Sequence, residues 1–184
     1  MDPWKIILIV IACILGLYVF FSCVLGILII QLSIRPLTQS NEHHRLNNIK
    51  KGYIIGAENM KREELLLKMK DGYEIHADVS LNDPKKFVIV SHGHCANRNA
   101  VIKYARVFYN LGYSVFLFDQ RGHGSNKRHK CLMGHQEHKD LLEIISKLKE
   151  HYGRDIELGL FGVSMGGAST LMALKYEQDL KFAV

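Results

Sequence analysis

The chain has 184 residues and a formal net charge of +6 at pH 7, and 48% of its residues are hydrophobic. This length supports one domain with a core of its own. The densest basic run, Lys127 to Lys130, has no interleaved Phe, Tyr or Trp, which argues against nucleic-acid binding. We interpret it as a solvated loop, with attraction to anionic lipid as the alternative. The four cysteines form no disulfide framework and are expected to be free thiols.

An apolar run near the N-terminus is the first predicted element. Residues 6–30 contain no charged side chain, and as a helix these residues would span about 37 Å, against roughly 30 Å for a hydrocarbon core. We predict one transmembrane helix within an anchor that comprises residues 1–34. The alternative is a cleaved signal peptide, but the run is longer than a usual signal core and no Ala-x-Ala site follows it.

The basic residues around this run predict its orientation. One lysine precedes the run, whereas four basic residues lie within about 20 residues after it: Arg35, Arg45, Lys50 and Lys51. The positive-inside rule then places the following domain in the cytoplasm. The oligomeric state is left open by the sequence.

Residues 35–52 are polar and aperiodic, so we interpret them as a linker before a domain at residues 53–184. The domain opens with two strands around Asp71-Gly72, which is a strong hairpin signal. An apolar strand at 87–91 is typical of a central parallel strand. Further strands and helices then alternate, which indicates an α/β fold with a parallel sheet. The expected ranges are helices at 98–110, 136–150 and 168–176, and strands at 114–118, 155–161 and 180–184.

The sequence Gly162-Val-Ser-Met-Gly166 lies between the last full strand and the last helix. A Gly-x-Ser-x-Gly motif in this position forms a sharp turn that raises the serine hydroxyl above the sheet. Ser164 is therefore the candidate nucleophile. An oxyanion hole takes one N–H from the residue after the nucleophile and one from the loop after an earlier strand. By position these N–H groups belong to Met165 and His94.

A second loop, Asp119-Gln-Arg-Gly-His-Gly124, follows the strand at 114–118. We expect Asp119 and Arg121 to brace this loop rather than to react. Two histidine pairs have spacings that metal sites use, His92-x-His94 and His135-x-x-His138. Without a supporting cluster of Cys, Asp or Glu, they predict neither a metal site nor a cofactor.

Three motifs in this order resemble the α/β-hydrolase superfamily, and within it the serine-aminopeptidase/lysophospholipase-like branch and related bacterial single-pass membrane hydrolases. The motifs are His92-Gly-His-Cys-Ala-Asn-Arg98, Asp119-Gln-Arg-Gly-His-Gly124 and Gly162-Val-Ser-Met-Gly-Gly167. The resemblance covers roughly residues 53–184. It implies a mostly parallel sheet flanked by helices, no cofactor, and hydrolysis of an ester, thioester or amide in a small-molecule, lipid or peptide substrate.

The chain departs from that family after the nucleophile. The family order is nucleophile, acid, histidine, but after Ser164 the only acids are Glu177 and Asp179 and no histidine occurs. We therefore expect this sequence to be the N-terminal part of a hydrolase domain whose remaining triad residues lie downstream. The upstream residues His94 and His123 are weaker candidates for a base. The alternative is a catalytically inactive remnant or a membrane-tethered binding module.

Overall fold

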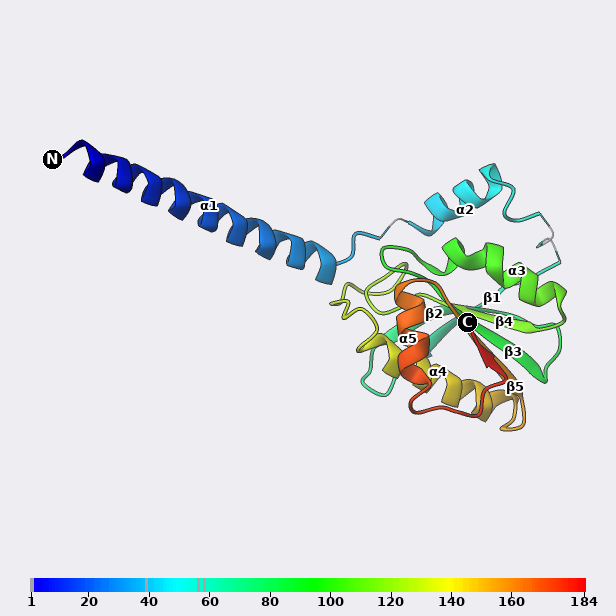
Figure 1. Cartoon of the computed structure of the whole chain (residues 1–184). Helices are drawn as coiled ribbons and strands as arrows, with labels where there is room; N and C mark the ends of the chain where they lie inside the picture. Colours follow the sequence, from blue (N-terminus) through cyan, green and yellow to red (C-terminus); the bar gives the residue numbers. More distant parts are fainter. Residues whose placement is uncertain (1, 39, 56, 58) are drawn as a thin grey trace. The chain divides into compact units, whose positions relative to one another are not determined.

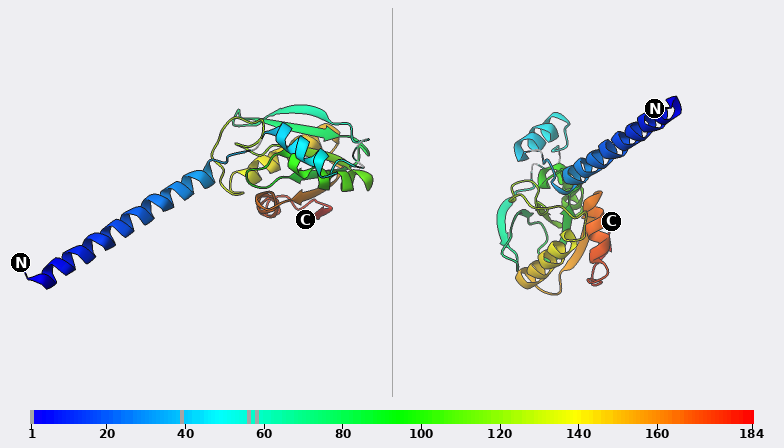
Figure 2. Two further views of the ribbon diagram at one scale, coloured as in Figure 1. Left: turned by 90° about the horizontal axis from the view of Figure 1, so that it is seen from above. Right: turned by 90° about the vertical axis from the view of Figure 1, so that its left-hand side faces the viewer.

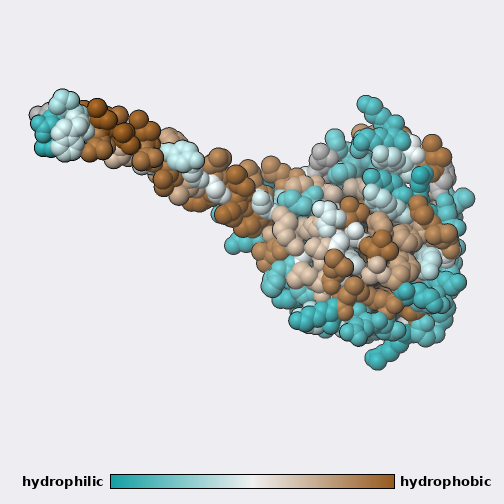
Figure 3. All heavy atoms as spheres, in the orientation of Figure 1, coloured by the Kyte–Doolittle hydropathy of each residue, from teal (hydrophilic) through white to brown (hydrophobic). Residues whose placement is uncertain are grey.

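The computed structural model describes residues 2–38, 40–55, 57 and 59–184; residues 1, 39, 56 and 58 of the predicted ranges lie outside it. Its contacts divide the chain into two units, Met1–Ile34 and Arg35–Val184. The first unit consists of one long helix, α1 (Pro3–Ile34) (Figure 2). None of its described residues is buried, and its surface is hydrophobic along most of its length (Figure 3). By length and composition this helix could cross a membrane, a property that signal sequences share.

The second unit is built on a six-stranded sheet with the order β1-β2-β4-β3-β5-β6 (Figure 1). The strands are β1 (Glu63–Lys68), β2 (Glu74–Ser80), β3 (Lys86–Ser91), β4 (Ser114–Phe118), β5 (Glu157–Gly162) and β6 (Phe182–Ala183). Strands β4, β3, β5 and β6 are parallel, and the β1–β2 hairpin joins β4 through antiparallel pairing. This confirms the predicted α/β fold with a mostly parallel sheet and a hairpin around Asp71-Gly72.

Helices cover both faces of this sheet (Figures 1 and 2). Because side chains alternate along a strand, β3 sends Phe87 and Ile89 to one face and Val88 and Val90 to the other. Helix α4 (Glu137–Tyr152) packs on the first face, and α5 (Met165–Ala173) packs against α4 and β5. The second face is covered by α3 (Ile102–Asn110), which a short 3-10 helix, η1 (Arg98–Val101), precedes. The predicted helix at 98–110 thus divides into two helical types.

The linker prediction was wrong for part of residues 35–52, because a helix, α2, occupies Asn41–Lys50 and belongs to the second unit. Ser40 caps it by accepting a hydrogen bond from the His43 N–H at 3.1 Å. The buried Asn48 side chain donates to the Asn99 carbonyl at 2.6 Å. The Asn99 amide in turn donates to Asn41 at 3.1 Å. The helix is held by polar contacts, which is why no apolar periodicity reveals it.

Candidate active site

The turn around Ser164 joins β5 to α5 and has a strained backbone. Ser164 has φ 54° and ψ −115°, a region that side chains other than glycine rarely adopt. The Val163 N–H donates to the Ser91 carbonyl at 3.0 Å, and the Gly166 N–H donates to the Val163 carbonyl at 2.9 Å. The residue Ser164 is exposed. A serine held in this way at a strand-to-helix turn has the geometry that the motif predicts.

Two glycines allow this turn to form. A Cβ on Gly162 would collide with the backbone of Gly166, and a Cβ on Gly166 would collide with the carbonyls of Ser91 and His92. Helix α5 begins at Met165, directly after the serine, and not at residue 168 as predicted. Because glycine has poor helix propensity, the sequence pattern did not predict the first turn of this helix.

The loop after β3 lies against this turn. A Cβ built on Gly93 would be 3.4 Å from the Cβ of Ser164, so the segment that carries His94 is adjacent to the serine. Within the described residues, the backbone N–H groups of His94 and Met165 donate no hydrogen bond to the protein. Both are therefore free to bind an external acceptor. The role of these two N–H groups as an oxyanion hole stays a prediction.

The preceding histidine, His92, is a structural residue. Its Nδ1 is 2.7 Å from the Gly93 carbonyl, and its Nε2 accepts a hydrogen bond from the Gln120 N–H at 2.9 Å. Burial, reinforced by the neighbouring His123, lowers the pKa of His92 to about 4. The imidazole is therefore neutral at pH 7 and ties the loop after β3 to the loop after β4.

Asp119 fixes the loop after β4. Its carboxylate accepts hydrogen bonds from the backbone N–H groups of Arg98 at 2.8 Å and Ser125 at 2.9 Å. The Arg98 side chain adds an ion pair at 2.5 Å to Asp119 and another at 3.1 Å to Asp78. Burial opposes the charge on Arg98, but the two carboxylates raise the pKa of Arg98. This arrangement confirms the predicted bracing role.

Arg121 braces the same loop from its other side. It donates twice to Asp140, at 2.9 and 2.7 Å, and forms a 2.7 Å ion pair with Asp71 in the hairpin turn. Its guanidinium also lies 4.2 Å from the centre of the Tyr73 ring. The hydrogen bonds to Asp140 raise the pKa of Arg121 against the opposing effect of burial. Arg121 is therefore a positioning residue, as predicted.

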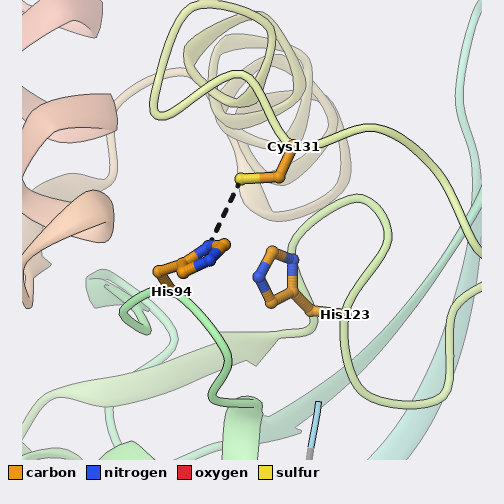
Figure 4. A group of neighbouring side chains, drawn as sticks. All are labelled: His94, His123 and Cys131. Atoms are coloured by element: carbon orange, nitrogen blue, oxygen red, sulfur yellow. Dashed lines mark hydrogen bonds between the residues drawn. The ribbon is translucent and has the colours of Figure 1, made fainter. Parts of the chain in front are cut away.

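A cluster that sequence analysis missed lies beside these loops: His94, His123 and Cys131 (Figure 4). Their potential ligand atoms all lie within 4.8 Å of one another. The Cys131 Sγ is 3.6 Å from the His94 Nδ1 and 3.1 Å from the Met165 Sδ. Burial raises the pKa of the Cys131 thiol to about 11. Sequence spacing gave no signal because Cys131 is 37 residues from His94.

This cluster changes the interpretation of the histidine pairs. The reason for predicting no metal site was that no Cys, Asp or Glu supported His94, and the structure places a cysteine beside it. The other pair, His135 and His138, forms a ring contact with centroids 6.2 Å apart. Among the described residues, neither His94 nor His123 forms a hydrogen bond with the Ser164 hydroxyl. The described contacts therefore give neither histidine a role as its base.

Comparison with known proteins gives the family. Residues 82–184, more than half of the chain, match the family described as serine aminopeptidase, S33. The chain belongs to this family of α/β-hydrolases. The "Uncharacterized protein YqkD" of Bacillus subtilis (strain 168) is 29% identical over 116 residues, which are 62% of this chain and 38% of that protein. The chain therefore spans well under half the length of this curated relative.

Solved structures of α/β-hydrolases resemble the second unit. Pyrococcus furiosus esterase Pf2001 aligns with a TM-score of 0.61 at 24% identity, over 67% of this chain and 50% of that protein. XC6422 from Xanthomonas campestris, an α/β serine hydrolase without a lid, aligns with a TM-score of 0.53 at 25% identity. The alignment covers 62% of this chain and 56% of that protein. These likenesses confirm the predicted fold.

Proposed function

We propose that this chain is the anchor and nucleophile-bearing part of a membrane-anchored serine hydrolase. The observation that carries the proposal is the strained, exposed Ser164 between β5 and α5, with the free N–H groups of His94 and Met165 beside it. Membership of a hydrolase family supports it. The bond class is an ester, thioester or amide, in a small-molecule, lipid or peptide substrate.

In this mechanism the Ser164 oxygen attacks the carbonyl carbon and its proton passes to a general base. The carbonyl oxygen becomes an oxyanion and accepts hydrogen bonds from the His94 and Met165 N–H groups. The leaving group takes the proton as the tetrahedral intermediate collapses to an acyl-enzyme. Water then attacks the acyl group, with the same base accepting its proton, and releases the acid while Ser164 is regenerated.

The proposal places the base histidine and its acid in a segment that follows residue 184 in a longer protein. The residues after Ser164 contain only Glu177 and Asp179 as acids and no histidine. The second candidate is an inactive membrane-tethered protein that keeps the fold without a triad. The absence of a base bonded to Ser164 among the described residues favours this candidate if no further segment exists.

One experiment separates the two candidates. Membranes from the source are treated with a fluorophosphonate probe, and the product is followed with an antibody to residues 35–60. We expect a labelled band above 21.0 kDa that disappears in Ser164→Ala and persists in Ser146→Ala, an exposed helix serine. A folded, stable and unlabelled band at 21.0 kDa would exclude the hydrolase and support the inactive protein.

We also propose that α1 anchors the protein and that the second unit is cytoplasmic. The uncharged run within α1 and the excess of basic residues after it support this orientation. Resistance of the chain to alkaline extraction tests anchoring, and protease digestion of right-side-out and inverted vesicles tests orientation. We expect digestion of the second unit in inverted vesicles only. An N-terminus that begins after residue 30 would instead identify a signal sequence.

A further inference from the structure

Three side chains from two loops point toward one another (Figure 4). His94 follows β3, His123 follows β4, and Cys131 precedes α4. The Cys131 Sγ and the His94 Nδ1 are 3.6 Å apart. Two ligands at about 2.3 and 2.0 Å from a tetrahedral zinc ion are themselves about 3.5 Å apart. The spacing of this pair is therefore that of two ligands of one ion.

The hydrogen bonds of His123 leave one ring nitrogen available. His123 is fully buried, its Nδ1 is 2.9 Å from the Arg121 carbonyl, and its Nε2 has no partner among the described residues. The carbonyl fixes the proton on Nδ1, so Nε2 presents a lone pair to the cluster. Metal-bound histidines are oriented by this kind of second hydrogen bond.

The neighbouring His92 shows the contrast. Its ring centroid is 5.2 Å from that of His123, yet both of its nitrogens already have backbone partners. A buried polar atom without a partner is rare and calls for an explanation. A metal ion bound to the Nε2 atom of His123 would explain this one. The geometry thus distinguishes the imidazole that can bind an ion from the one that cannot.

Cys131 and Met165 determine the kind of ion. Cys131 is almost fully buried, and its sulfur is 3.1 Å from the thioether sulfur of Met165. A thiolate with two imidazoles suits Zn²⁺, and a thioether in addition suits Cu⁺. Hard ions such as Mg²⁺ and Ca²⁺ prefer oxygen ligands, and this cluster offers none.

We propose that His94, His123 and Cys131 bind one soft d10 metal ion, Zn²⁺ or Cu⁺, with Met165 as an added ligand for Cu⁺. The ion joins the loop that follows β3 to the connection between β4 and α4, which carries both His123 and Cys131. This site goes beyond the proposed hydrolase function and does not depend on it, because binding can be measured whether or not Ser164 reacts.

The full chain in detergent, reduced and stripped of metal, is titrated with Co²⁺ as a spectroscopic substitute for Zn²⁺. We expect one equivalent to bind with a thiolate-to-cobalt charge-transfer band that Zn²⁺ abolishes. Cys131→Ala removes the band and weakens binding by more than about 100-fold, since loss of an outer partner alone costs about 10–100-fold. Cys95→Ser is the matched control and leaves both unchanged.

A parallel titration with Cu⁺ against a chromophoric Cu⁺ chelator distinguishes the two ions. Met165→Leu is expected to weaken Cu⁺ binding at least about tenfold and to leave Zn²⁺ binding unchanged. His94→Gln, at a half-buried position, gives a second ligand variant that is less demanding on folding than the buried His123. The site would be disproved if the wild-type chain bound these ions no more tightly than the folded Cys131→Ala and His94→Gln variants.

Discussion

Arg98 and Asp119 are joined twice, once through the backbone and once through the side chains. The Arg98 N–H donates to one carboxylate oxygen of Asp119 at 2.8 Å. The Arg98 guanidinium donates to the other carboxylate oxygen at 2.5 Å. Both residues are buried. The Asp78 carboxylate also forms an ion pair with the Arg98 guanidinium at 3.1 Å. Burial raises the pKa of Asp78 above its ordinary value. Arg98 therefore pairs with two buried carboxylates, and Arg62 is a second partner of Asp78 at 3.5 Å.

Arg98→Ala is expected to lower the free energy of unfolding by about 3–5 kcal/mol, because two carboxylates lose their buried partner. Near-UV circular dichroism of the tyrosines during urea unfolding measures it, since the single tryptophan, Trp4, lies in α1. Arg62→Ala is the comparison variant: Arg62 is more exposed, reaches Asp78 only at 3.5 Å and donates one hydrogen bond to Asn99 at 2.7 Å, so a smaller loss is expected. Equal losses in the two variants would contradict the central role of Arg98.

Gly166→Ala is expected to destabilise the second unit by at least about 2 kcal/mol, because the added Cβ meets the backbone of Ser91 and His92, which cannot move freely. Gly167→Ala is the matched control, since its Cβ comes only to 3.3 Å from the Gly162 carbonyl and alanine favours a helix. Urea unfolding compares the two variants. A Gly166→Ala protein as stable as Gly167→Ala would show that the turn is looser than described.

Asn48→Ala is expected to release α2, because the Asn99 carbonyl loses its 2.6 Å hydrogen bond in a buried position. The cost is about 1–3 kcal/mol. Hydrogen exchange of the amides at residues 41–50 should accelerate by at least about tenfold. Asn47→Ala, at a more exposed neighbouring position, should leave exchange unchanged. Unchanged exchange in Asn48→Ala would contradict the docking of α2 by polar contacts.

The metal-free chain is expected to lose stability as the pH falls below 6.5. Burial lowers the pKa of His92 from 6.5 to about 4, with His123 acting in the same direction and the hydrogen bond to the Gly93 carbonyl and the charge of Asp119 opposing both. Between these pH values the unfolded chain binds the proton and the native chain does not, so the free energy of unfolding rises with pH.

For His92 the difference between pH 5 and pH 7 is about 2 kcal/mol in favour of pH 7. Urea unfolding at both values, with a chelator present, measures this difference. His129→Gln, at an exposed histidine, is the control and should show the same stability difference between the two pH values. Equal stability at pH 5 and pH 7 would mean that the His92 imidazole is not held neutral.

The sequence by itself determined the alternation of strands and helices, the hairpin at Asp71-Gly72, the turn at Ser164 and the apolar helix at the N-terminus. These features follow from local patterns: apolar periodicity, turn residues and a motif five residues long. The family assignment rested on the same kind of signal, because three short motifs in order are visible without any structure.

Only the tertiary structure decided where polar side chains meet. Helix α2 is held by asparagines, so its sequence shows no apolar stripe. The cluster of His94, His123 and Cys131 joins the loop after β3 to the connection between β4 and α4. Arg98 reaches Asp78 in β2 and Asp119 in the loop after β4. Such contacts depend on the order of strands in the sheet, and local periodicity carries no information about which loops that order brings together.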